Sequence, residues 1–106
     1  MEKPRGHPWI FKRFIFKMKI KVELFGASRE FSKNNLIEFE IKNNSTIKNI
    51  RDEMINYLDL NFNGNKDFKK IVETSVFCTE NNNIVSDNYK ITKNQKIAII
   101  PPIGGG

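Results

Sequence analysis

One main helical segment lies between stretches that alternate apolar and polar residues, and this order restricts the folds open to the chain. Apolar residues recur at the spacing of one helix face from Ile47 to Leu58, and the polar run at residues 43–46 supplies N-cap oxygens. The pattern predicts a helix that ends near Leu60. Its opposite face mixes charges and is predicted to be solvated; that face comprises Lys48, Asn49, Arg51, Asp52, Glu53, Asn56 and Asp59.

Two strands are predicted before this helix. Apolar and charged residues alternate over residues 19–25 and again over residues 36–42, which is the period of a half-buried strand. Residues 26–35 between them are predicted to be a loop, so the two strands are expected to pair as an antiparallel hairpin. The inward residues are Ile20, Val22 and Leu24 in the first strand, and Ile37, Phe39 and Ile41 in the second.

Shorter elements are predicted after the helix. They are a second helix over residues 67–73, strands over 75–79 and 96–100, and a two-residue return strand at 84–85, with Ile91 as an isolated apolar plug. This order fits a hairpin, a helical crossover and a last strand that returns parallel to the first. The predicted fold is therefore α+β: a β-grasp (ubiquitin-like) mixed sheet with one main helix packed on one face. The 106 residues suffice for one such domain.

The net charge of +6 is confined to the start of the chain. Residues 1–21 carry seven Lys or Arg and one acidic residue, whereas residues 22–106 carry eleven of each sign. We therefore divide the chain into a basic, aromatic extension (1–18), a domain (19–100) and a tail (101–106). One hypothesis is that the basic and aromatic side chains at this end bind nucleic acid or an anionic membrane surface. The alternative is a dispensable extension, as chain termini commonly are.

The composition argues against several classes of protein and site. The single cysteine, Cys78, cannot form an intramolecular disulfide, and with the single histidine, His7, it cannot complete a Cys/His zinc site. No apolar run approaches the ~20 residues of a membrane helix. We therefore expect a cytoplasmic protein that binds no metal. No activated nucleophile is recognisable, and Cys78 is predicted to be a buried strand residue.

The last predicted strand leads directly into Pro101-Pro102-Ile103-Gly104-Gly105-Gly106. The two prolines cannot continue a sheet ladder and favour an extended path, so they are predicted to form a stiff stalk. The three glycines lack a Cβ and can enter a narrow channel or pass beside a nucleotide. Fully extended, residues 101–106 would reach about 20 Å, with the carboxylate of Gly106 at the tip. This shape suits delivery of a carboxylate into another enzyme's active site; the alternative is a frayed terminus.

Three segments together carry a resemblance to a known family. They are residues 20–30, with Phe25, Ala27 and Arg29-Glu30; the helix at 46–58; and the ending over residues 97–106, with its Pro-Pro-x-x-Gly-Gly pattern. Residues 19–106 resemble the MoaD/ThiS family of ubiquitin-like sulfur carriers, in particular the small subunit of molybdopterin synthase.

This resemblance implies that Gly106 is the reacting residue. A ubiquitin-activating-like adenylyltransferase would use ATP and magnesium to adenylate its carboxylate, and a cysteine desulfurase or rhodanese-like sulfur donor would convert the product to a thiocarboxylate. Residues 101–105 would insert into the large subunit of a molybdopterin synthase-type complex, where the sulfur is used to make molybdopterin for the molybdenum cofactor. The chain would be a non-catalytic sulfur-donor subunit that binds no cofactor stably. A carrier for thiazole or tRNA thiolation, and a protein modifier conjugated through Gly106, remain open alternatives.

By the same resemblance, Phe25, Arg29, Ile84 and Ile100 lie on the partner-facing surface. The alternative interpretation is ordinary core for the three apolar residues and a loop salt bridge for Arg29. The chain departs from the family at residues 92–96, where Thr-Lys-Asn-Gln-Lys replaces the usual acidic turn. This departure leaves open how the charges of the domain complement those of a partner.

Overall fold

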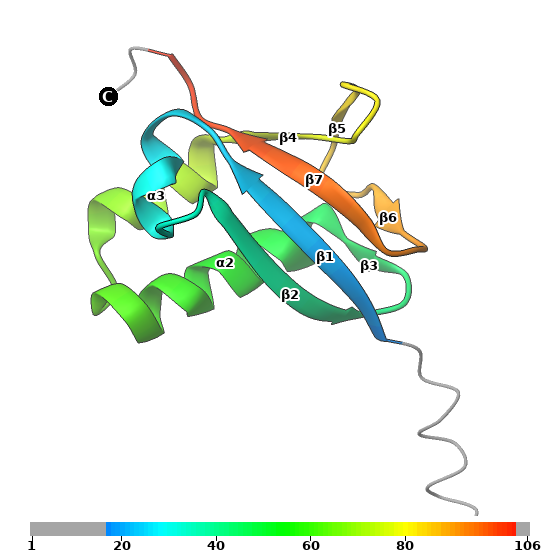
Figure 1. The fold of residues 1–106 in the computed structure, drawn as a ribbon, viewed down its shortest axis with the longest axis horizontal. Helices are drawn as coiled ribbons and strands as arrows, with labels where there is room; N and C mark the ends of the chain where they lie inside the picture. The colour runs from blue at the N-terminus through cyan, green and yellow to red at the C-terminus, as the bar shows by residue number, and fades with distance from the viewer. Residues whose placement is uncertain (1–16, 104–106) are drawn as a thin grey trace, which may run out of the picture.

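A computed structural model describes residues 17–103 of the chain. The elements in chain order are β1 (Lys17–Leu24), the 3-10 helix η1 (Gly26–Phe31), β2 (Leu36–Lys42), β3 (Ser45–Thr46), α2 (Ile47–Phe62), α3 (Lys66–Thr74), β4 (Val76–Cys78), β5 (Ile84–Val85), β6 (Lys90–Ile91) and β7 (Gln95–Ile100). Five strands form a sheet in the order β2-β1-β7-β4-β5, and α2 and α3 lie across one of its sides (Figure 1). β1 is antiparallel to β2 but parallel to β7, which confirms the predicted β-grasp topology.

The first strand begins at Lys17 and not at Lys19 as predicted. Met18 is only 5% exposed and lies opposite Ile41 of β2, so the hairpin is longer at this end than the alternation indicated. Residues 17 and 18 therefore belong to the domain and not to the extension. The strand keeps its predicted alternation, because Ile20, Val22 and Leu24 are all buried.

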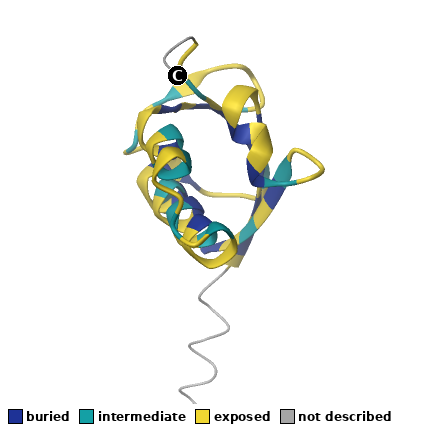
Figure 2. Cartoon of the chain, turned by 90° about the vertical axis from the view of Figure 1, so that its left-hand side faces the viewer, coloured by how far each residue is buried: buried dark blue, intermediate teal, exposed yellow. Residues whose placement is uncertain are grey.

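The main helix follows its predicted pattern closely. Thr46 is the N-cap: its hydroxyl accepts a hydrogen bond from the backbone N–H of Asn49, and the Asn49 side chain accepts one from the backbone N–H of Thr46. The helix ends at Phe62, followed by Asn63 in the left-handed conformation with φ of 54°. Buried positions face the space between the helices and the sheet, as the dark blue segments of Figure 2 show. On α2 these are Ile47, Ile50, Met54 and Leu58.

A two-stranded sheet at the start of α2 was not predicted. β3 pairs with β6, so that Ser45 lies opposite Ile91. The first N–H groups of the helix, on Ile47 and Lys48, donate to the backbone carbonyls of Tyr89 and Asp87 at 3.1 Å each. Ile91, expected as an isolated plug, is a fully buried strand residue that helps to hold the start of the main helix.

Arg51 corrects the prediction that the polar face of α2 is simply solvated. Its guanidinium donates to the carboxylate of Asp87 at 2.8 Å and to the carbonyl oxygens of Val72 and Ser75 at 2.7 Å each. The same group lies over the Phe77 ring, 4.9 Å from the centroid. Arg51 thus connects α2 with the end of α3, with β4 and with the segment after β5.

The segment expected to be a plain loop between the first two strands contains η1, which packs against α3. Phe31 at the end of η1 lies 5.2 Å from Phe68 of α3, measured between ring centroids, and the Tyr57 hydroxyl donates to the Phe31 carbonyl at 2.6 Å. The N-cap of α3 is Asn65, whose side chain accepts from the N–H of Phe68. These contacts hold η1 and α3 together beside the point where the tail leaves the sheet.

Candidate functional site: the tail root and the adjacent sheet surface

The tail leaves the fold from the middle of the sheet. β7 is paired with β1 on one side and with β4 on the other, so its end at Ile100 is held from both sides (Figure 1). Residues 101 and 102, here called the tail root, continue from that end. Pro101 is partly buried, and its Cδ lies 3.7 Å from the point where a Cβ on Gly26 would be. The fold therefore fixes the direction in which the tail departs.

From Pro102 onward, the described part of the tail projects from the domain. Pro102 is exposed, and the side chain of Ile103 is 99% exposed. An isoleucine in full contact with water has no internal packing role, so it is available to a partner. The predicted site residues Gly104, Gly105 and Gly106 lie outside the residues that the structure describes.

The four residues expected on the partner surface are all exposed. Phe25 is 36%, Ile84 70% and Ile100 37% exposed, and Arg29 lies on the exposed surface of η1. The alternative interpretation of the three apolar residues as core is therefore wrong. The salt bridge suggested for Arg29 is not seen with any other residue between 17 and 103.

Strand pairing brings most of these residues onto one side of the sheet, opposite the helices. Ile97 and Ile99 of β7 are buried, so Ala98 and Ile100 between and after them point to the other side. Across β7, β4 and β5 the register places Ala98 beside Cys78 and Cys78 beside Ile84, while Val76 pairs with Ile100. We call this surface the outer patch; it comprises Phe25, Val76, Ile84, Ala98 and Ile100.

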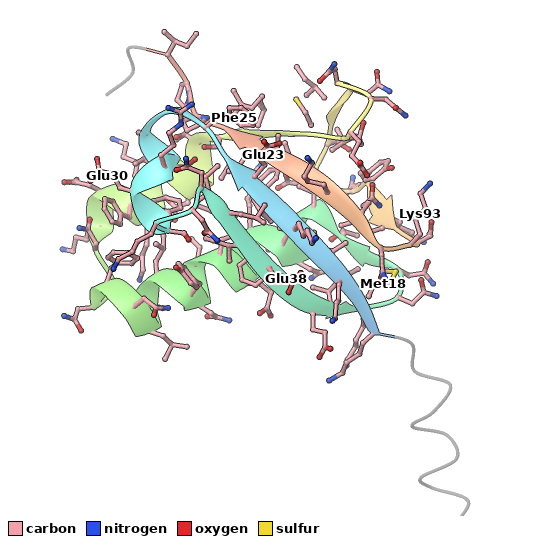
Figure 3. The ribbon with its side chains drawn as sticks, viewed as in Figure 1. Met18, Glu23, Phe25, Glu30, Glu38 and Lys93 are labelled. Atoms are coloured by element: carbon pink, nitrogen blue, oxygen red, sulfur yellow. The ribbon has the colours of Figure 1, made fainter. Side chains whose placement is uncertain are left out.

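A shallow cavity of about 270 Å³ lies within the outer patch. Phe25, Ala98 and Ile100 form its apolar lining together with Cys78, which is 8% exposed and so is the buried strand residue expected. Figure 3 shows Phe25 and Glu23 at the end of the sheet from which the tail departs. The structure thus brings Phe25 and Ile100 into one hollow and places Ile84 beside it, whereas Arg29 does not line this hollow.

Sequence reasoning missed Val76 and Ala98 as members of the outer patch, and Cys78 as part of the lining of its cavity. Their positions on the outward side follow from strand parity: each alternates with a buried neighbour, such as Phe77 or Ile97. The sequence alone shows which side of its strand each of these residues faces. Only the strand register of the structure shows which strands are neighbours, and so whether these residues meet.

The charged rim of the cavity is arranged around Lys96. Its ammonium lies 3.9 Å from the carboxylate of Glu23, and its backbone N–H donates to Glu80 at 3.3 Å. The turn that departs from the family pattern lies at the other end of β7, where the Asn94 side chain accepts from the N–H of Lys19 at 2.9 Å; Lys93 of this turn lies far from Phe25 in Figure 3. Of the departure at residues 92–96, residues 92–94 are therefore remote from the tail root, whereas Lys96 places a changed charge at the rim of the outer-patch cavity.

Within residues 17–103, no group of three or more His, Cys, Asp or Glu side chains is placed to hold a metal ion. In the same part of the chain, no helix has the length and apolar character needed to cross a bilayer.

Solved structures of low sequence identity share this fold. SAMP1 from Haloferax volcanii has a TM-score of 0.59 at 14% identity and covers 83% of this chain and 99% of its own. A ubiquitin from Caldiarchaeum subterraneum has a TM-score of 0.54 at 18% identity, with 86% and 100% covered. A Pyrococcus furiosus protein assigned as molybdopterin converting factor, subunit 1, has a TM-score of 0.56 at 15% identity, with 81% and 99% covered.

No curated protein sequence matches this chain. The model of the ThiS family, however, matches residues 22–106, from the middle of β1 to the last glycine. This segment contains the second half of β1, all later elements including β4 and β7, and the tail. The chain therefore belongs to the ThiS family of ubiquitin-fold proteins.

Proposed function

We propose that this protein is a sulfur carrier whose Gly106 carboxylate is first adenylated and then converted to a thiocarboxylate. The observation that carries the proposal is the combination of a ThiS-family domain with a tail that leaves a central strand next to an exposed apolar patch. The fold holds the tail root, while the three glycines at residues 104–106 carry no Cβ and fit a narrow active site. The domain supplies the docking surface and the reacting terminus, and its partners supply the catalysis.

The chemistry requires two steps because a carboxylate is a poor acyl donor. In the first step a carboxylate oxygen attacks the α-phosphorus of ATP bound with magnesium by the adenylating partner, and pyrophosphate leaves. In the second step the terminal sulfur of a persulfide on a desulfurase or rhodanese-like donor attacks the acyl carbon, and AMP leaves with the carboxylate oxygen, so that an acyl disulfide joins the tail to the donor. The step ends when a second thiol, from a partner or from a small-molecule reductant, attacks the donor sulfur of this disulfide. The donor then leaves as a disulfide with that thiol, and the tail is released as a thiocarboxylate, which is a soft nucleophile.

For the destination of the sulfur, we propose molybdopterin synthesis, with this chain as the small subunit of a molybdopterin synthase-type complex. The resemblance of residues 97–106 to that subunit supports this, as does the shared fold of the Pyrococcus furiosus protein assigned as molybdopterin converting factor, subunit 1. The outer patch would then bind the large subunit while residues 101–106 enter its active site. Phe25, Ile84 and Ile100 would supply apolar contact area, with Arg29 beside them.

Intact-mass analysis tests the carrier function. The full chain is incubated with a ThiS-family activating enzyme, ATP, magnesium, a persulfide donor and a thiol reductant, and we expect the mass gain of one sulfur in place of one oxygen. A chain lacking Gly105 and Gly106 is the control and should stay unchanged. If the full chain also stays unchanged while a known carrier is converted in the same mixture, the proposal is wrong. Copurification with a synthase-type large subunit then tests the destination.

A second candidate function is protein modification through Gly106, favoured by the shared fold of SAMP1, a small archaeal modifier protein. A modifier would leave a tail-derived remnant on lysines of other proteins. Because Lys96 is the last basic residue, trypsin would leave residues 97–106 on each modified lysine. Finding this branched remnant in cell extracts would favour the modifier, whereas finding the thiocarboxylate alone would favour the carrier.

A further inference from the structure

A second hollow lies on the other flank of the tail root. It has a volume of about 480 Å³ and is bounded by the tail root, by Ala27 of η1 and by one side of α3. The α3 residues that line it are Asp67, Lys70, Ile71 and Thr74, which are spaced as a single helical stripe. We call this hollow the root groove. The tail root therefore stands between two hollows: the outer-patch cavity with Phe25 and Ile100, and the root groove.

The root groove has apolar walls and a charged edge, which suit it to binding a protein. Ala27, Ile71 and the two prolines give it apolar walls, and Asp67 and Lys70 place one charge of each sign at its edge. No ion pair joins either of these two side chains to another residue in the described range 17–103. By contrast Lys69, the neighbour of Lys70, is paired with Asp59 at 2.7 Å. The groove thus fits an apolar side chain flanked by one cationic and one anionic group.

We propose that the adenylating partner docks on the root groove as well as on the outer patch, and so contacts the tail root on both flanks. This inference rests on the proposed carrier function. The argument is continuity: the prolines of the tail root form a wall of the groove, so a protein that draws the tail into its active site must pass along this wall. A partner seated only on the outer patch would leave the other flank of the root in water.

Contacts on both flanks of the tail root would offset the entropy cost of ordering the tail. Fixing the backbone of each tail residue costs about 1–2 kcal/mol, and the glycines offer no side chain through which a partner can recover it. Contacts on both sides of the root supply this binding energy at a place where the two prolines already restrain the backbone.

The test fills the groove without disturbing the core. Thr74 and Glu73 are adjacent, exposed residues of α3, but only Thr74 lines the groove, so Thr74→Trp is compared with Glu73→Trp. Adenylation is followed by ATP–pyrophosphate exchange with the activating enzyme and the full chain. We expect Thr74→Trp to raise the KM for the carrier by about tenfold with little change in kcat. Partner contacts at the root groove stabilise the bound ground state and the transition state equally, so their loss weakens binding and not the chemical step. Glu73→Trp should behave as the unchanged chain.

A charge reversal gives an independent pair of variants in case the tryptophan alters folding. Lys70→Glu places a negative charge in the groove, whereas Lys66→Glu makes the same change on an exposed α3 residue outside it. We expect the first to raise KM and the second to leave it unchanged, with both variants unfolding at the same temperature as the unchanged chain.

The outcomes separate this inference from the proposed function. If the unchanged chain is not adenylated at all, the carrier function fails and the inference fails with it. If the unchanged chain is adenylated and Thr74→Trp and Lys70→Glu keep its KM within about twofold, only the root-groove inference is overturned. Normal adenylation combined with weakened binding to a synthase-type large subunit would assign the groove to that acceptor and also overturn the inference.

Discussion

The Arg51 side chain alone connects several segments of this small domain. We predict that Arg51→Ala lowers the free energy of unfolding by about 2–3 kcal/mol, because it leaves the Asp87 carboxylate and the carbonyls of Val72 and Ser75 without their shared donor. Urea unfolding followed by circular dichroism measures the change. The guanidinium fork is needed, so Arg51→Lys should recover only part of the loss.

Lys48 provides the control for Arg51. It lies on the same helix and forms an ion pair with Asp52 at 3.6 Å, but both side chains are well exposed. Lys48→Ala should therefore change the unfolding free energy by no more than about 0.5 kcal/mol. Equal effects of Arg51→Ala and Lys48→Ala would show that the Arg51 contacts contribute little to stability.

Gly26 is a residue whose backbone conformation restricts the side chains that can replace it. Its φ is +56°, and a Cβ there would meet Pro101 only at ordinary contact distance, so conformation and not space opposes a side chain. We predict that Gly26→Ala destabilises the domain by about 1 kcal/mol, whereas Gly26→Asn costs less because asparagine tolerates the left-handed region better. Thermal unfolding of the two variants checks this order; a reversed order would contradict the role assigned to φ.

At the scale of elements, adjacent residues of β7 have opposite roles. Ile99 is fully buried, and Ile99→Ala should cost about 2–4 kcal/mol of stability. Ile100 is 37% exposed, so Ile100→Ala should cost less than about 1 kcal/mol while weakening binding to the partner that accepts the tail. Chemical unfolding and calorimetric titration with that partner separate the two effects. A stability loss for Ile100→Ala as large as that for Ile99→Ala would contradict its placement on the outer patch.

Long elements show their period in the sequence. β1, β2 and α2 are long enough for this, and each was predicted to within two residues at its ends. The two-residue strand β5 was predicted because it follows a polar turn after β4, whereas β3 and β6, also of two residues each, were not recognised as strands. η1 was missed because its only fully buried apolar residue is Phe31, at its end. Arg51 was misjudged because periodicity marks a face as polar without showing that another segment covers it.

At the scale of the whole molecule, the candidate site combines features of two kinds. The tail could be recognised from the sequence because its residues are contiguous and their chemistry is local: two prolines, then glycines. The surfaces beside it could not, because they are assembled from η1, α3, β4, β5 and β7, and their members meet only through the strand register and helix packing. The root groove in particular depends on α3 and the tail root lying side by side, which no local pattern shows.

The extent of the domain gives a prediction for the whole chain. A chain that begins at Lys17 retains every strand and helix described here, so we expect its unfolding free energy to stay within about 0.5 kcal/mol of the full chain and its adenylation KM to be unchanged. A chain that begins at Lys19 loses Met18, which is 5% exposed, and should be less stable by about 1–2 kcal/mol. Urea unfolding of both chains places the boundary.

The same truncation decides whether the basic extension has a function of its own. If residues 1–21 form a nucleic-acid arm, the full chain should bind RNA with an affinity that falls steeply as the salt concentration rises. The chain that begins at Lys17 lacks four of the seven basic residues in this range and should lose most of that affinity. Lys17, Lys19 and Lys21 remain exposed on β1 in both chains, so they serve as an internal control for the charge of the sheet surface. Equal binding by the two chains would place any RNA contact on β1 and not on the extension, and binding by neither would leave the extension without a role in anion recognition.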